Sequence, residues 1–216
     1  MFEILPGILE KDWKEIERKF EIYRPFAKRI HVDFLDGKFA PNTTFLDPAP
    51  FAKYAQDFIL EAHMMLDNPI NYLKPFADAG FQRFIGHVEK MPDQVEFVAA
   101  AELLGEVGLG IDTGTPLDAI KVSLEDLDTI LIMTVAAGFS GQQFMEQNLD
   151  KVKQLATKTT IPIEVDGGVN ESTIKVGCAA GASRFVATSF LFGAETPEKQ
   201  YQLLKECTRP FETTLS

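Results

Sequence analysis

The sequence predicts a single (β/α)8 barrel, and three observations carry the prediction. Short apolar runs with strand character recur along the chain, amphipathic stretches separate them, and there are eight such units in 216 residues. Strict alternation of strands and helices implies a parallel sheet. Eight units favour a closed barrel, with an open doubly wound sheet as the alternative. The predicted strands are 3–9, 29–35, 58–66, 84–88, 107–111, 129–135, 161–165 and 184–192.

Helical spacing marks the segments between these strands. Trp13, Ile16 and Phe20 lie at i, i+3 and i+7, so they form one apolar stripe on a helix. A similar stripe runs through residues 144–155. Glycines at the ends of such segments are typical helix stops, because glycine readily adopts the left-handed conformation that ends a helix. The stops predicted in this way are Gly80, Gly105 and Gly181.

Composition and charge restrict the class of protein. A chain of 216 residues with 45% hydrophobic and 25% charged residues is ordinary for one globular domain, so residues 1–216 are expected to form one barrel. The net charge of −11 argues against nucleic acid or an anionic membrane as a partner. A small anionic substrate stays possible, because backbone amides and a metal supply positive potential locally.

The cysteines and the N-terminal residues bear on the cellular compartment. Cys178 and Cys207 stand alone, without the CxxC spacing of a redox or zinc motif. A reduced, cytoplasmic location is therefore expected. Residues 1–6 contain neither a basic segment nor a long apolar stretch, so we predict no targeting signal and no transmembrane helix.

Histidines and acids gather at the ends of three predicted strands. His31 and Asp33 share one face of their strand because side chains alternate with period two. His63 shares a face with Glu61 in the next strand, and Asp166 ends a later one. Strand ends on the carboxyl side of a barrel meet around one site. Two histidines and two aspartates there can close around one divalent metal.

Glycine-rich segments follow the sixth and seventh predicted strands. Glycines in loops are by default turn residues. In barrels, however, the loops near strands seven and eight commonly bind phosphate through backbone amides. The segments that this rule favours as a phosphate site are Gly138-Phe139-Ser140-Gly141, Gly167-Gly168 and Thr188-Ser189.

Five blocks in order resemble the ribulose-phosphate 3-epimerase family, and they span nearly the whole chain. Any one block is weak evidence, whereas five in register are specific. The blocks are HVDFLDG at 31–37 with Phe39, Pro41-Asn42 and Thr44-Phe45; EAHMM at 61–65; MTV at 133–135 with Gly138-Phe139 and Gly141-Gln142; EVDGGV at 164–169; and residues 186–192.

The resemblance implies a ribulose-phosphate-binding barrel that epimerises C3 of a ketose phosphate through a metal-stabilised enediolate. The first expectation is D-ribulose 5-phosphate and D-xylulose 5-phosphate, in the pentose phosphate pathway, by a cytoplasmic homo-oligomer. The implied metal ligands are His31, Asp33, His63 and Asp166, and the two aspartates are also the implied acid/base pair. The phosphate site maps to Gly138, Phe139, Ser140, Gly141, Gly167, Gly168, Thr188 and Ser189.

The ligand types leave the metal and the neighbouring roles open. Two histidines and two carboxylates suit zinc, manganese or ferrous iron. Glu164 either orients a ligand or forms a salt link inside the barrel. Met65 and Met133 either line the pocket above the metal or simply fill the barrel. His87 has no ligand role in the resemblance and is expected behind the ligands or in the pocket wall.

Several positions depart from the family pattern. Gly7 stands where the family has a serine whose hydroxyl contacts substrate, and Leu35 stands for a methionine. Ala136-Ala137 replaces a Glu-Pro pair, and Thr188 replaces a common glycine, as it does in the related allulose-6-phosphate epimerases. These departures surround the substrate, whereas the metal and proton-transfer set is intact. They bear on the sugar rather than on the reaction.

Other functions remain as alternatives. An allulose-6-phosphate 3-epimerase is the nearest, and a non-catalytic sugar-phosphate binder is favoured by the altered loops but not by the retained aspartates. A decarboxylase or aldolase on the related barrel ranks low. Such decarboxylases carry an Asp-x-Lys-x-x-Asp cluster at a strand end, and the sequence contains no such run.

Overall fold

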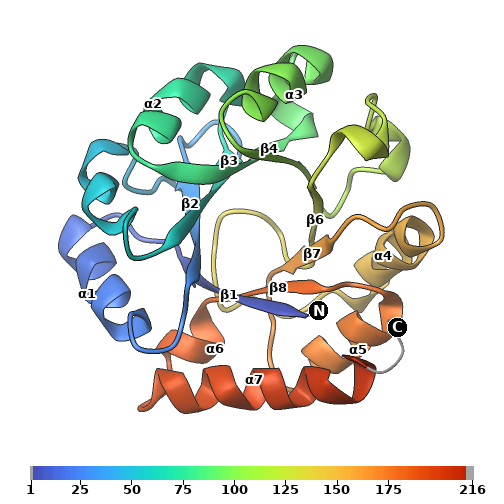
Figure 1. The fold of residues 1–216 in the computed structure, drawn as a ribbon. Helices are drawn as coiled ribbons and strands as arrows, with labels where there is room; N and C mark the ends of the chain where they lie inside the picture. The colour runs from blue at the N-terminus through green and yellow to red at the C-terminus, as the bar shows by residue number, and fades with distance from the viewer. Residues whose placement is uncertain (1, 213–216) are drawn as a thin grey trace.

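Eight parallel strands close into a barrel surrounded by helices (Figure 1). The computed structural model describes residues 2–212. Each strand pairs in parallel with the next along the chain, and β1 (Glu3–Ile8) closes the ring against β8 (Arg184–Ala187). The predicted (β/α)8 barrel is therefore confirmed, and the open sheet is excluded.

The remaining strands are β2 (Arg29–Leu35), β3 (Ile59–Met65), β4 (Phe81–His87), β5 (Glu106–Ile111), β6 (Thr129–Met133) and β7 (Ile163–Asp166). The helices are α1 (Trp13–Tyr23), α2 (Leu73–Asp78), α3 (Gln94–Glu102), α4 (Leu149–Ala156), α5 (Thr173–Ala180), α6 (Ser189–Phe192) and α7 (Pro197–Glu212). Short 3-10 segments are η1 (Ala49–Tyr54), η2 (Pro69–Tyr72), η3 (Val88–Lys90), η4 (Leu117–Ala119), η5 (Leu124–Asp126) and η6 (Glu146–Asn148). Among the described residues, no helix has the length and apolarity needed to span a membrane.

Helix α1 follows directly from its local sequence. The carboxylate of Asp12 accepts a hydrogen bond from the backbone N–H of Lys14 at 2.8 Å, and so caps the first turn. Ile16 and Phe20 are buried against the sheet, as the predicted stripe requires. The helix ends near Pro25, which cannot continue the hydrogen-bonding pattern.

The prediction of a strand over residues 184–192 is wrong in its second half. β8 ends at Ala187, which pairs with Pro6, and the following residues form the short helix α6. A short apolar run fits a strand and a buried helical turn equally well by pattern alone. In α6 only Leu191 is fully buried, so one side chain of the run anchors the turn to the core.

An aromatic cluster fills the layer between the sheet and the elements α1, η1 and α2. Phe51 in η1 is fully buried at its centre. Its ring lies 5.0 Å from that of Trp13 and 5.4 Å from that of Phe81, measured between centroids. The rings of Phe20, Phe34 and Phe45 surround it at 5.7 to 6.3 Å. Through Phe34 and Phe81 these contacts fasten the outer layer to β2 and β4, two of the strands that carry the site.

Replacing Phe51 by alanine should lower the free energy of unfolding by about 3–5 kcal/mol, because a large buried ring leaves a cavity. Urea denaturation of purified protein measures the change. Leu103→Ala is the control, since that side chain is 86% exposed, and its effect should stay within about 0.5 kcal/mol. A loss for Phe51→Ala no larger than that of the control would contradict this role.

Candidate metal centre

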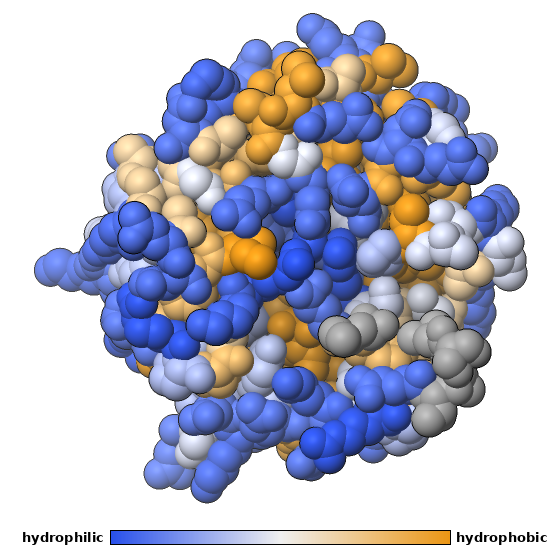
Figure 2. Space-filling model, in the orientation of Figure 1, coloured by the Kyte–Doolittle hydropathy of each residue, from blue (hydrophilic) through white to orange (hydrophobic). Residues whose placement is uncertain are grey.

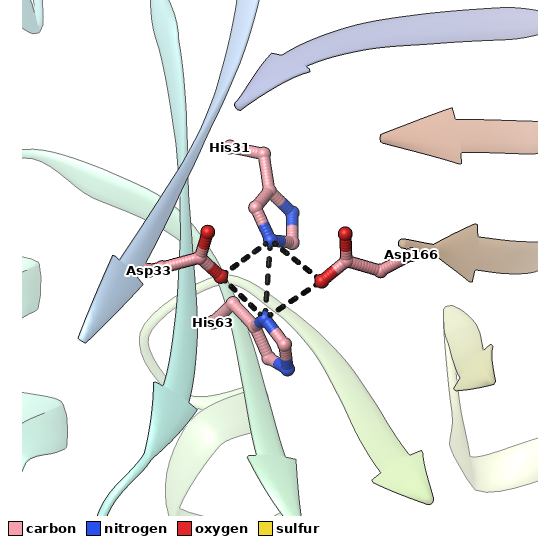
Figure 3. A group of neighbouring side chains, drawn as sticks. All are labelled: His31, Asp33, His63 and Asp166. Carbon is pink, nitrogen blue, oxygen red and sulfur yellow. Dashed lines mark hydrogen bonds and ion pairs between the residues drawn. The ribbon is translucent and has the colours of Figure 1, made fainter. Parts of the chain in front are cut away.

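The four predicted ligand residues meet inside the barrel (Figure 3). His31 and Asp33 project from β2 and His63 from β3, where Asp33 pairs with His63 in register. Asp166 reaches the same point from the end of β7. All four side chains are buried. The alternation of strand side chains therefore places these residues together, as the sequence indicates.

The facing atoms of this cluster lie close to one another. Nε2 of His31 is 3.1 Å from Nδ1 of His63. Oδ1 of Asp33 lies 3.2 Å from the first nitrogen and 2.8 Å from the second. Oδ2 of Asp166 completes the group at 3.8 and 3.4 Å from the same two nitrogens.

The far nitrogen of His31 fixes which of its ring atoms carries a proton. Nδ1 lies 2.5 Å from Oε1 of Glu61 and 3.3 Å from Oε1 of Glu164. Burial opposes ionisation of Glu61, but the hydrogen bond from His31 and the charge of Arg83 hold its pKa well below the usual range. An ionised carboxylate only accepts hydrogen bonds, so Nδ1 carries a proton and donates it. Burial opposes protonation of His31, but the charge of Asp33 and the hydrogen bonds to the nearby carboxylates raise the pKa of His31 well above its usual range, so Nε2 carries a proton as well when no metal is bound. A metal ion would displace that second proton and bind the lone pair of Nε2.

The cluster fits a divalent metal by the chemistry of its atoms. Nε2 of His31 and the oxygens of Asp33 and Asp166 converge on one point. Electron-pair donors at these distances repel one another unless a cation lies among them. Two imidazoles and two carboxylates are ligands that zinc, manganese and ferrous iron accept. The residues present can thus hold the metal, and they do not select one of the three.

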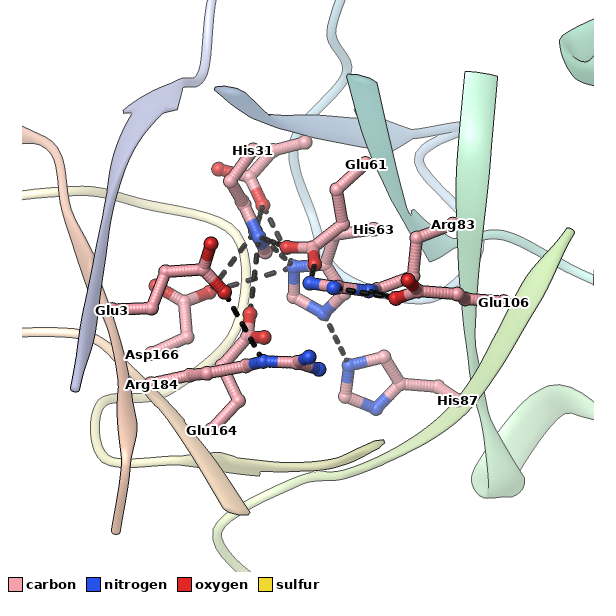
Figure 4. A network of polar contacts seen from close by, with 11 residues as sticks. Glu3, His31, Glu61, His63, Arg83, His87, Glu106, Glu164, Asp166 and Arg184 are labelled. Atoms are coloured by element: carbon pink, nitrogen blue, oxygen red, sulfur yellow. Dashed lines mark hydrogen bonds and ion pairs between the residues drawn. The ribbon is translucent and has the colours of Figure 1, made fainter. Parts of the chain in front are cut away.

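A buried network of charges supports the cluster on its inner side (Figure 4). Arg83, only 1% exposed, contacts Oε2 of Glu61 through Nη1 at 2.5 Å. Its Nε donates to Glu106 at 2.6 Å. Oε1 of Glu164 lies 3.3 Å from Nδ1 of His31, while both oxygens of this buried carboxylate lack a hydrogen-bond partner among the described residues, so orientation of a ligand stays a prediction for Glu164. Figure 2 shows hydrophilic residues gathered at the centre of the barrel in this view.

Sequence reasoning missed Arg83, which was not among the candidate residues. β4 begins at Phe81 rather than at the predicted residue 84, because an arginine inside an apolar run hides the strand pattern. The alternation of side chains along a strand could have revealed it. Arg83 shares a face with Ile85 and His87, and that face points into the barrel. The pairing of Arg83 with Glu61 across β3 and β4 then follows from register.

The two aspartates differ in protonation. Burial opposes ionisation of Asp33, but the positive charge of His31 and its hydrogen bond to Asp33 hold the pKa of Asp33 below the usual range. Burial, reinforced by the negative charge of Asp33, raises the pKa of Asp166 to about 7. Near neutral pH the pair therefore consists of an ionised Asp33 and an Asp166 that holds or readily takes up a proton.

A cavity opens above the cluster. Asp33 and Asp166 lie in its wall, and so do Met65 and Met133. The glycine-rich loops and the start of α6 form the rest of the wall. The predicted phosphate-site residues that line it are Gly138, Phe139, Ser140, Gly141, Gly167, Gly168, Thr188 and Ser189.

Gly7 differs from the other predicted pocket residues. It is buried and does not line this cavity. A Cβ atom at this position would collide with the hydroxyl of Thr188. Thr188 makes no capping hydrogen bond to α6, so its side chain turns instead toward the space above Gly7. The two departures from the family pattern are thus complementary in shape.

The loops around the cavity have a backbone that favours glycine. Gly138 and Gly167 have φ of +108° and +111°, which side chains rarely tolerate. The side-chain amide of Asn42 donates to the carbonyl oxygen of Gly138 at 2.6 Å and ties this loop to the segment after β2. Apart from Phe139, these loops line the cavity with backbone and small side chains.

Comparison with known proteins identifies the family. The model of the "Ribulose-phosphate 3 epimerase family" matches residues 3–192. The chain belongs to this family. A ribulose-phosphate 3-epimerase of Mycobacterium leprae is 34% identical over 209 residues, covering 94% of this chain and 93% of the relative. The cytoplasmic isoform from Oryza sativa is also 34% identical over 213 residues, with the same coverage. The enzyme of Bacillus subtilis is 32% identical and covers 92% of this chain and 96% of its own.

Solved structures show the same barrel at much lower identity. KGPDC from Streptococcus mutans superposes with a TM-score of 0.75 at 13% identity, over 98% of this chain and 100% of that chain. The 3-keto-L-gulonate-6-phosphate decarboxylase of Vibrio cholerae has a TM-score of 0.74 at 15% identity, over 98% and 99%. At these identities the similarity shows the fold alone. The expectation of an isomerase of the epimerase type is confirmed by membership of the family.

Asp166→Asn should stabilise the protein in a pH-dependent way. The folded pKa of about 7 lies above the ordinary value of 3.8. Between these pH values the native state binds a proton that the unfolded state has lost, so the contribution of Asp166 to stability falls as pH rises. Asparagine does not ionise. The gain of the variant should therefore grow from pH 4 to pH 8 in urea denaturation with a chelator present, and a pH-independent difference would contradict this assignment.

Proposed function

We propose that this protein is a metal-dependent ketose-phosphate 3-epimerase that interconverts D-ribulose 5-phosphate and D-xylulose 5-phosphate. The observation that carries the proposal is the placement of two buried carboxylates, Asp33 and Asp166, on either side of one candidate metal site. Relatives at 32–34% identity over almost the whole chain are named ribulose-phosphate 3-epimerases.

Inversion at C3 requires proton transfer on both faces of the substrate. Asp33 comes from β2 and Asp166 from β7, and in Figure 3 their carboxylates point toward each other across the cluster. A planar enediolate lying between them would have one carboxylate on each face. Asp33 is ionised and takes the C3 proton, and Asp166 returns a proton to the other face. The roles reverse in the opposite direction, and the separated pKa values of the pair suit this exchange.

The metal would be held by Nε2 of His31, Nδ1 of His63 and one oxygen from each aspartate. When bound, a divalent ion would act as a Lewis acid that offsets the negative charge left when the C3 proton departs. The chain itself keeps the ligand atoms in place. Glu61 holds the ring of His31, and Arg83 holds Glu61. Enclosure in the barrel limits water near the reacting carbon.

The phosphate group would be held by neutral donors. The cavity wall includes the hydroxyls of Ser140, Thr188 and Ser189 and the backbone of the glycine loops. Among the described residues that line it, none is a lysine or an arginine. Backbone amides and hydroxyls can form an anion site without a charged side chain. This resolves the apparent conflict between an anionic substrate and a chain with net charge −11.

A six-carbon ketose phosphate is the second candidate substrate. Thr188 occupies the space above Gly7 and so reshapes one wall next to the aspartates. A wall altered in this way changes which substrate hydroxyls find partners, and unpaired polar groups discriminate strongly between sugars. Allulose 6-phosphate is therefore the sugar to compare with ribulose 5-phosphate.

The test is isotope exchange in D2O. Metal-loaded protein is incubated with ribulose 5-phosphate, and C3 is followed by NMR. The proposal predicts deuterium at C3 together with the appearance of xylulose 5-phosphate. If deuterium exchange occurred with allulose 6-phosphate and not with ribulose 5-phosphate, the six-carbon sugar would replace the five-carbon sugar as the proposed substrate. Binding of both sugars without exchange would overturn the catalytic proposal and indicate a sugar-phosphate binder.

Asp33→Asn and Asp166→Asn should each lower kcat by about 10²–10⁴-fold, because each removes one proton-transfer group while keeping an oxygen toward the metal. Steady-state epimerase assays measure the loss, and metal content is determined for each variant. Asp78→Asn is the control, since Asp78 lies on α2 in an exposed ion pair with Lys74. Near-normal turnover in either variant would show that the substituted aspartate is not a proton-transfer group.

A further inference from the structure

The ring of His63 is held from behind by a chain of hydrogen bonds that leads to Glu89. Nε2 of His63 lies 2.8 Å from Nε2 of His87, a contact drawn in Figure 4. Nδ1 of His87 lies 3.0 Å from Oε2 of Glu89. The other oxygen of Glu89 accepts the backbone N–H of Asp112 at 2.8 Å. Both histidines are fully buried, so water does not compete for these bonds.

Glu89 sets which atom donates in each of these hydrogen bonds. The ionised carboxylate of Glu89 only accepts, so Nδ1 of His87 carries a proton and donates it. In a neutral imidazole the other nitrogen is then an acceptor, and Nε2 of His87 accepts from Nε2–H of His63. The proton of His63 is thus on Nε2. Its Nδ1 is left with a lone pair, and this is the atom that faces Asp33 and His31.

The reverse arrangement is unfavourable at the outer end. If Nδ1 of His63 carried the proton, it would donate to Asp33, and Nε2 would accept from His87. Nδ1 of His87 would then present a lone pair to the carboxylate of Glu89 at 3.0 Å. Two acceptors facing each other in a buried site are repulsive. In the favoured arrangement the lone pair of Nδ1 of His63 faces Asp33 instead, and there the proposed metal ion would bind both atoms.

Neighbouring residues pack closely against the ring of His87. On one side the ring of Phe39 lies 4.6 Å away between centroids. On the other side is Gly110, where an added Cβ would lie only 2.9 Å from Nε2 of His87. The absence of a side chain at Gly110 makes room for the ring. These contacts restrict the orientation of the His87 ring in the hydrogen-bond relay that runs from His63 through His87 to Glu89.

We propose that Glu89 is a positioning residue for the metal centre, acting through His87 to keep Nδ1 of His63 unprotonated and aimed at the metal. This inference rests on the proposed metal site and adds two residues to it. Neither Glu89 nor His87 would touch the metal or the substrate. Partners of this kind set the orientation and proton position of a ligand, and their loss commonly weakens metal binding.

Glu89→Gln tests the relay with little change of shape. A glutamine amide cannot accept from both His87 and the backbone N–H of Asp112, so its NH2 group must face one of two donors. We expect zinc affinity, measured by competition with a chromogenic chelator, to fall by about 10–100-fold. In ¹⁵N NMR of the three histidines, the proton of His87 should shift from Nδ1 toward Nε2. Glu102→Gln removes an exposed carboxylate on α3 and should match wild type in both measurements.

The outcomes separate this inference from the proposed function. A wild-type protein that binds no zinc overturns the metal centre and the inference together. A Glu89→Gln variant that binds zinc as tightly as a zinc-binding wild type overturns the inference alone, as does a wild-type His87 without a proton on Nδ1. Should Glu89→Gln fail to fold, Gly110→Ala takes its place. Its methyl group displaces the His87 ring while every donor and acceptor stays, and unchanged zinc affinity there also contradicts the relay.

Discussion

The structure depends on one electrostatic constraint: electron-pair donors converge at the centre of a barrel where water is scarce. His31, His63 and two aspartates face one another at 2.8 to 3.8 Å. Atoms of this kind are stable together only around a positive charge, whether a shared proton or a metal ion. The same constraint accounts for the unequal aspartates. One carboxylate is stabilised as an anion by the histidines, and the other retains a proton beside it.

The charges inside the barrel are arranged to keep the ring nitrogens turned toward this centre. Glu61 receives the far N–H of His31 and is in turn held by Arg83. His87 receives the far N–H of His63 and donates its own Nδ1–H to Glu89. A barrel interior filled only by aliphatic side chains would be easier to stabilise. The buried network lowers that stability and gains a fixed geometry, so the strands that form the core also set the directions of the lone pairs.

Much of the fold and of the cluster was predictable, because both depend on periodicity. Alternation places His31 beside Asp33, and parallel pairing then places His63 beside them. The errors have physical causes as well. The arginine in β4 obscures its start. The apolar run after Ala187 fits a strand by pattern, yet it turns into α6 after the last pair with β1, between Pro6 and Ala187. Gly7 and Thr188 are explained only by their contact in space, and the link from His63 to Glu89 joins residues whose sequence spacing does not reveal it.

The central claim is that a single divalent cation belongs among these four side chains. The most direct test is a crystal grown with zinc and measured at the zinc absorption edge, where anomalous scattering locates the ion independently of the protein coordinates. We expect one peak, coordinated by Nε2 of His31, Nδ1 of His63 and an oxygen from each of Asp33 and Asp166. A fully zinc-exposed crystal with no peak at this point, or with coordination through the opposite ring nitrogens, would contradict it.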